Sequence, residues 1–306
     1  MTAATTFDEH PQTLPIAAAT LARQELGCRT DPLLPAQALA LPWLSLGRQS
    51  ASKTSKSKRR TSQGSLTSSS LTARLRAQLP AFAPLLEELE IAGWSASGSP
   101  SHGNFHDWLL LGGDRVLVVA GHATSTEPAG AEESAMVAQA AWSAIRAHAI
   151  HTRDAGKLLS LAAQTVWTSP EAAIRAAVAV ALVDTTGGEV NIALAGDCLA
   201  WRIRAASCEQ FTICQPLLGA APDFAYLSHA FELSLRERLI LTVDDAHERP
   251  PRLATNIAAA FSHLDAETHR RMTAADAVTL VSQHYEGDRP TTVAGESASV
   301  AAIRRR

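Results

Sequence analysis

Three apolar runs joined by short polar turns constrain the fold of this chain more than any other feature of its sequence. The runs span residues 174–183, 190–195 and 199–203, and the connection between the first two reads Asp-Thr-Thr-Gly-Gly. Runs of this length and composition are typical of buried strands, and connections this short join antiparallel neighbours. The sequence therefore predicts an antiparallel meander in this part of the chain.

Further strands and helices are expected on both sides of the meander. A hairpin is predicted at 109–120, where Gly112-Gly113-Asp114 separates two apolar runs. More strands are expected at 211–214, 231–233, 239–243 and 299–303, and helices at 131–150, 155–167, 252–264 and 273–285. The helices come in blocks beside the strands instead of alternating with them. This order favours an α+β fold of layered antiparallel sheets over a parallel βαβ array.

The first seventy residues have a composition that does not favour a packed core. Residues 49–70 read QSASKTSKSKRRTSQGSLTSSS and contain a single leucine, so burial cannot offset the loss of chain entropy. We therefore expect a disordered lead-in over 1–70 that includes this basic, Ser-rich linker. The basic run 56–60 could hold an anionic partner or be a phosphorylation target, or it could be a solvated linker.

A short helical segment is expected to follow at 71–99, and a folded domain at 100–306. Within the segment leucines recur at near-helical spacing, and Pro80 and Pro84 interrupt the pattern, so one broken helix or two short helices would fit.

Composition excludes several classes of protein. No apolar run approaches the roughly 20 residues that span a bilayer as a helix, so no membrane partner is expected. The net charge is −3, which makes nucleic acid an unlikely partner. The four cysteines, 28, 198, 208 and 214, are too scattered for a disulfide framework. They are expected to be reduced, in a cytoplasmic setting, and the sequence specifies no oligomeric state.

Short polar motifs recur where predicted strands end or begin. They are Gly121-His122 after 116–120, Gly196-Asp197 after 192–195, Asp244-Asp245 after 239–243, and Glu296 just before the last strand. Acidic side chains gathered at one edge of a sandwich could bind a hard divalent cation through oxygen. Gly and Asp are also ordinary turn residues, and that interpretation remains open.

The order and spacing of these motifs resemble those of the PPM serine/threonine protein phosphatases, particularly their SpoIIE-like bacterial branch. The family's opening motif resembles Gly103-Asn104-Phe105-His106-Asp107, and its first metal motif resembles Val118-Val119-Ala120-Gly121-His122. Later steps resemble Ala195-Gly196-Asp197, Pro216-Leu217-Leu218-Gly219, the run 239–245 with Glu248, and Glu296-Ser297-Ala298-Ser299. The resemblance covers about residues 100–306, and the sequential set carries it because no single motif is specific.

The resemblance implies a four-layer α-β-β-α sandwich of two antiparallel sheets with a two-metal centre. Mn²⁺ or Mg²⁺ would activate a water that attacks a phosphoserine or phosphothreonine ester of a phosphoprotein. The implied metal ligands are Asp244, Glu296, Asn104, Asp107 and Gly121. The chain departs from the family pattern because the bridging aspartate falls on Ala120 or Gly121, and because neutral Asn104 replaces an aspartate.

Three functions therefore remain open. An active phosphatase would need carboxylates from elsewhere, for example Asp107, Asp197 or Asp245. A pseudophosphatase without a cofactor would keep the sandwich as a module that binds phosphoproteins or a signalling partner. The third possibility is a different α+β binding protein whose similarity is accidental.

A different metal site is also open. His102, His106 and His122 are expected near Asp244, and such a set could favour zinc or another transition ion. Surface-loop histidines are the alternative.

Overall fold

The structure is a computed structural model that describes residues 79–80, 83–96, 103–124, 131–167, 175–204, 207–244, 252–287 and 298–306. For Thr124, 131–133, Asp244, 252–256 and 286–287 it describes the backbone only. The expected lead-in 1–70 and most of 71–82 lie outside the described residues.

Ten strands form two five-stranded sheets in the part of the chain that the structure describes, and all their neighbours are antiparallel. The first sheet, in spatial order, contains β1 (Leu89–Ser95), β10 (Ala298–Arg305), β9 (Arg238–Asp244), β6 (Cys198–Arg204) and β7 (Ser207–Phe211). The second contains β2 (Gly103–Leu111), β3 (Arg115–Thr124), β4 (Arg175–Asp184), β5 (Glu189–Ala195) and β8 (Ser228–Glu232). The first two strands of the predicted meander, β4 and β5, pair as expected. The prediction is wrong for the third, because β6 leaves the second sheet and pairs with β9 and β7 in the first.

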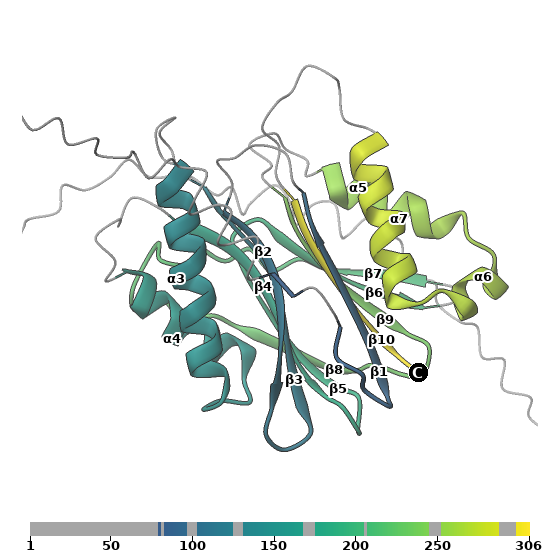
Figure 1. Cartoon of the computed structure of the whole chain (residues 1–306), viewed down its shortest axis with the longest axis horizontal. Helices are drawn as coiled ribbons and strands as arrows, with labels where there is room; N and C mark the ends of the chain where they lie inside the picture. The colour runs from purple at the N-terminus through teal and green to yellow at the C-terminus, as the bar shows by residue number, and fades with distance from the viewer. Residues whose placement is uncertain are drawn as a thin grey trace, which may run out of the picture. The chain divides into compact units, whose positions relative to one another are not determined.

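Helices cover the outer face of each sheet, as Figure 1 shows. Helices α3 (Ala131–Ala149) and α4 (Ala155–Trp167) pack on the second sheet, and α5 (Arg252–Ser262) and α7 (Ala274–Gly287) on the first. A short helix, α6 (Ala266–Arg271), connects α5 and α7. The predicted four-layer α-β-β-α sandwich is confirmed.

Burial on both faces explains why the central strands read as continuous apolar runs. Along β3, Val116, Val118 and Ala120 lie between the sheets, whereas Leu117 and Val119 pack against the α3 and α4 layer. Successive side chains of a strand point to opposite faces, so a strand covered on both sides needs apolar residues at every position. None of the described helices is long and apolar enough to cross a membrane.

Several elements differ from the predictions. Residues 89–95, expected within a helical segment, form strand β1, because Leu89 and Ile91 are buried between the sheets and the whole stretch pairs with β10. The leucine spacing upstream of this stretch concealed its two-residue periodicity. The strand expected at 211–214 is shifted, because β7 spans Ser207–Phe211. Helix α6 was not expected: it lies between the helices predicted at 252–264 and 273–285, where the Asp265 side chain accepts hydrogen bonds from two backbone N–H groups and caps it.

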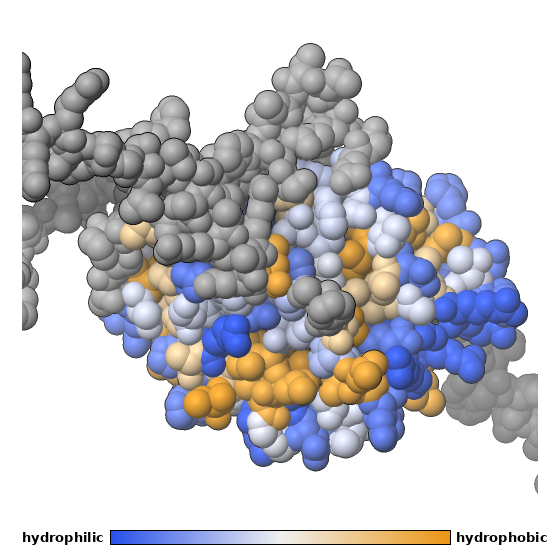
Figure 2. All heavy atoms as spheres, in the orientation of Figure 1, coloured by the Kyte–Doolittle hydropathy of each residue, from blue (hydrophilic) through white to orange (hydrophobic). Residues whose placement is uncertain are grey.

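The surface combines polar and apolar regions. On the face seen in Figure 2, hydrophilic residues dominate around α6, and apolar residues gather toward the lower centre of the view. The exposed apolar side chains include Leu110 of β2, which is 56% exposed, and Met136 and Ile150, which are 43% and 58% exposed.

Candidate functional site

The strand register brings the candidate motifs to one edge of the sandwich, which we call the motif edge. There β1 ends with Ser95 opposite Ser299, and β9 ends with Asp244 opposite Ala298. At the same edge Gly103 begins β2, opposite Ala123 near the end of β3. Antiparallel pairing alternates strand ends and starts along an edge, which is why segments distant in sequence meet here.

A chain of hydrogen bonds joins the two sheets at this edge. Ser95 Oγ of β1 lies 2.8 Å from His106 Nδ1 of β2 and 3.0 Å from Ser299 Oγ of β10. His106 is 6% exposed and Ser299 is fully buried. The contact between β1 and β2 therefore ties the first sheet to the second through uncharged groups.

A second hydrogen-bonded pair lies beside it on β2 and β3. His122 Nδ1 lies 2.6 Å from Asn104 Oδ1, and Asn104 Nδ2 donates to the carbonyl of Ala96 at 3.4 Å. Since the amide oxygen can only accept, Nδ1 of His122 carries the proton. Asn104 and His122 are 7% and 2% exposed. Ser95, Asn104, His106, His122 and Ser299 together form what we call the inter-sheet polar cluster.

Burial makes the imidazole of His106 a neutral group. It lowers the pKa of His106 to about 4, because the charged form loses its hydration between the sheets. Space for the ring comes from Gly93 of β1, where a Cβ would overlap the imidazole. A glycine at this position thus permits the close approach of His106 to β1.

The two positions on which the bridging carboxylate could fall point to opposite faces. Ala120 pairs with His106 and lies in the core between the sheets. Gly121 faces α3, where a Cβ would overlap the ring of Phe105. Only position 120 therefore directs a side chain toward the inter-sheet polar cluster, and there the chain has a methyl group.

Asp107 belongs to the outer face of β2. Its Oδ2 accepts a hydrogen bond from Trp142 Nε1 of α3 and lies 3.3 Å from Arg146 Nη1. Burial raises the pKa of Asp107, and the Trp142 hydrogen bond and the Arg146 charge oppose that increase. The structure thus places Asp107 apart from Asn104, on the side of β2 that faces α3.

The remaining candidates are described in part or not at all. Asp244 ends β9 and is described by its backbone only, and Asp197 is exposed in the turn between β5 and β6. His102, Asp245, Glu248 and Glu296 lie outside the described residues. Among the side chains that the structure describes, no three His, Cys, Asp or Glu residues form a group that could hold a metal ion.

The donors described at the motif edge do not fit the two-metal centre that the resemblance implies. Mg²⁺ and Mn²⁺ bind through carboxylate, carbonyl and water oxygens, and a bridging carboxylate offsets the charge of two nearby ions. The inter-sheet polar cluster offers hydroxyl, amide and imidazole groups and no carboxylate, and its described hydrogen bonds run within the cluster and to the Ala96 carbonyl.

Sequence reasoning missed the role of Ser95 and Ser299. Serine at a strand end carries no distinctive signal, and Ser95 lay in a stretch expected to be helical. The two-residue alternation from Leu89 to Ser95 is the signal that could have identified its strand.

Comparison with known proteins agrees with the fold. No family model and no curated protein matches the sequence. Among solved structures, the SiaA-PP2C domain of Pseudomonas aeruginosa matches with a TM-score of 0.58 and 16% identity, covering 78% of this chain and 94% of that domain. The RsbU and RsbW domains of Rv1364c from Mycobacterium tuberculosis match with a TM-score of 0.57 and 18% identity, covering 74% of this chain.

The chain spans 64% of the length of the Mycobacterium tuberculosis structure. RsbX, solved in complex with magnesium, matches with a TM-score of 0.52 and 11% identity over 74% of this chain and 99% of its own. The structural neighbours are thus PP2C-type and SpoIIE-type serine/threonine phosphatase domains, and at these identities the likeness establishes the fold.

Proposed function

We propose that this protein is a pseudophosphatase, a phosphatase-fold module that binds a phosphoprotein or signalling partner in the cytoplasm. One observation carries the proposal: the position that directs a side chain into the motif edge is Ala120, and a neutral hydrogen-bonded cluster lies around it. No disulfide joins the described cysteines, which is consistent with a reducing compartment. Fold alone does not license an activity, so the proposal rests on the residues of the edge.

The chemistry of the cluster supports binding over hydrolysis. Hydrolysis of a phosphate ester by this fold needs positive charge that stabilises the phosphoryl oxygens and a water activated near neutral pH. The cluster offers neither, because its imidazoles are engaged with Asn104 and Ser95 and the pKa of His106 is lowered.

Isothermal titration of the full chain with Mn²⁺ and with Mg²⁺, paired with hydrolysis of p-nitrophenyl phosphate in the same buffers, tests the proposal. We expect neither binding in the micromolar range nor turnover that depends on the metal. Micromolar binding accompanied by metal-dependent turnover would refute the pseudophosphatase assignment.

A divergent metal-dependent phosphatase is the second candidate, and the end of β9 favours it. Asp244 pairs with Ala298, and Glu296 precedes Ala298 by two residues in the sequence. Mn²⁺ or Mg²⁺ would then be held by Asp244 and Glu296 with Asn104 or the backbone of Gly121, and without Asp107, which faces α3. In this case Asp244→Asn abolishes metal-dependent hydrolysis, whereas unchanged turnover excludes Asp244 as a ligand.

A further inference from the structure

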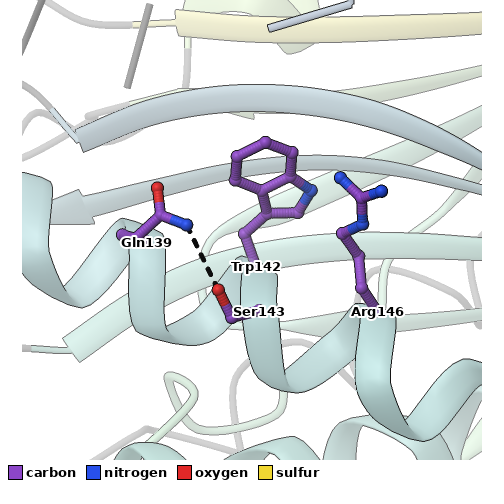
Figure 3. A pocket seen from close by; sticks show the side chains of 4 residues that line it. All are labelled: Gln139, Trp142, Ser143 and Arg146. Carbon is purple, nitrogen blue, oxygen red and sulfur yellow. Dashed lines mark hydrogen bonds between the residues drawn. The ribbon is translucent and has the colours of Figure 1, made fainter. Parts of the chain in front are cut away.

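A groove runs along one flank of α3, on the outer face of the second sheet, and among the site candidates it adjoins Asp107. It has a volume of about 460 Å³ and is lined by Gln139, Trp142, Ser143 and Arg146. Figure 3 shows Trp142 and Arg146 projecting in the same direction from the helix, with the amide of Gln139 bonded to the hydroxyl of Ser143. The groove therefore combines an aromatic wall with three polar side chains.

Contacts with β2 hold the two large side chains of the groove in place. Trp142 is 4% exposed and donates its indole N–H to Asp107, and the guanidinium of Arg146 lies 5.1 Å from the centre of the Trp142 ring. Arg146 Nη1 also lies 3.3 Å from Asp107 Oδ2. A guanidinium fixed by an aromatic face and a carboxylate loses less side-chain entropy when it binds a further group.

The charge of the groove favours an anionic ligand. Arg146 is the charged residue among the four that line it, and its side chain is 43% exposed, whereas that of Asp107 is 7% exposed. Asp107 contacts one terminal nitrogen and leaves the exposed side of the fork available. Guanidinium groups bind carboxylate and phosphate oxygens in pairs, which makes both suitable occupants.

The flank of α3 that carries the groove ends in apolar side chains. Met136, Gln139, Ser143, Arg146 and Ile150 follow one another in steps of three and four residues and so form one stripe, which continues one residue beyond the helix. Met136 and Ile150 are 43% and 58% exposed. On the other flank, His148 contacts Thr165 of α4 at 3.4 Å, so α4 packs against that side of the helix and not against the stripe.

We propose that this stripe binds an amphipathic helix of a partner protein. The partner helix places apolar residues against Met136 and Ile150 and an acidic or phosphorylated side chain against Arg146. A stripe from residue 136 to residue 150 extends about 21 Å, the length of roughly four helical turns. This inference rests on the proposed role as a binding module and gives that module a surface distinct from the motif edge.

The test follows the indole N–H of Trp142 by nuclear magnetic resonance. The full chain is labelled with ¹⁵N at the indole nitrogens of its six tryptophans, and Trp142→Phe identifies the signal. The probes are alanine-based helical peptides of about 15 residues, with leucine near each end and glutamate, phosphoserine or glutamine at the centre. We expect the glutamate and phosphoserine peptides to shift the Trp142 signal saturably, and the glutamine peptide to bind about tenfold more weakly.

Matched arginine variants make the result specific to the groove. Arg146→Gln is expected to weaken binding of the acidic peptides about tenfold, because the charged hydrogen bonds are lost. Arg270→Gln, which removes an exposed arginine from α6, is expected to leave binding unchanged. Arg146→Lys keeps the positive charge but lacks the planar guanidinium, so it is expected to weaken binding by an intermediate amount. This variant serves as the test if Arg146→Gln perturbs the fold.

Two outcomes overturn the proposal: no shift of the Trp142 signal at millimolar concentrations of either acidic peptide, or equal binding by Arg146→Gln and the unaltered chain. Much tighter binding of the phosphoserine peptide than of the glutamate peptide identifies a phosphorylated partner. Equal binding of these two peptides identifies an acidic partner. A negative peptide experiment does not change the result of the metal titration, and metal-dependent turnover would not change peptide binding. The two hypotheses can therefore be refuted independently.

Discussion

At the scale of single residues, the identity of position 120 decides the character of the motif edge. A methyl group there is compatible with the hydrogen bonds between Ser95 and His106 and between Asn104 and His122. A carboxylate at the same position would need a cation or a proton, since an unpaired charge between the sheets is costly. The absence of an aspartate at position 120 therefore explains why the surrounding hydrogen-bonded cluster needs no cation.

Aspartate substitutions at the adjacent positions 120 and 121 should differ in whether Mn²⁺ restores the stability that they remove. Ala120→Asp is expected to lower the free energy of unfolding by a few kcal/mol in metal-free buffer, with partial recovery in Mn²⁺. Gly121→Asp is expected to lose stability through overlap with Phe105 and to gain nothing from Mn²⁺. Urea unfolding in Mn²⁺ and in EDTA measures both, and equal recovery in the two variants would contradict the assigned faces of β3.

His106 should make the stability depend on pH. Its pKa is about 4 in the folded chain and near the ordinary 6.5 when unfolded, so the unfolded state binds more protons between these values. The free energy of unfolding is therefore highest above about pH 6.5. It decreases as the pH falls toward 4, by up to about 3 kcal/mol, because keeping His106 neutral becomes costly. Urea unfolding from pH 4.5 to 7.5 should show a flatter dependence for His106→Gln, and an equal slope in both proteins would exclude His106 as the cause.

At the scale of elements, β1 completes the sandwich. It pairs with β10 along its full length and buries Leu89 and Ile91 between the sheets. Its other face carries Trp94, which packs edge-on against Tyr285 of α7. The domain therefore begins before residue 89, earlier than the predicted start at residue 100.

Two truncations test the contribution of β1. A chain that begins at residue 71 should unfold cooperatively on heating, because it keeps every described element. A chain that begins at residue 97 should lose that transition, because β10 and α7 lose their partners and apolar surface is exposed. Circular dichroism melting measures both, and a cooperative transition in the shorter chain would show that β1 is dispensable.

Local patterns predicted most of the described elements well. The helix at 155–167 follows from the spacing of its apolar residues. The paired strands β4 and β5 follow from two apolar runs and the turn residues between them, all contiguous in the sequence. The inter-sheet polar cluster could not be predicted, because Ser95 and Ser299 meet only through the pairing of β1 with β10. The position of Asp107 required knowledge of the face of β2 that α3 covers, which a motif match does not contain.

At the scale of the whole molecule, the order of several weak motifs predicted the architecture. Overall sequence identity is a poor guide here, since it is only 11–18% with the reported structures. Motif order follows topology, and topology can persist while ligands change, so the fold alone does not establish metal chemistry. The described sandwich has three apolar cores, one between the sheets and one under each helical layer. Burial of apolar surface in these cores stabilises the folded domain.

The central claim is that the sandwich stands on this packing and on a neutral motif edge, with no contribution from divalent cations. Thermal unfolding of the full chain, measured in EDTA and again in millimolar Mn²⁺, tests it most directly, because an ion that binds only the folded state raises the midpoint. The account predicts the same unfolding midpoint in both buffers. A midpoint several degrees higher in Mn²⁺, lost again on adding chelator, would contradict it.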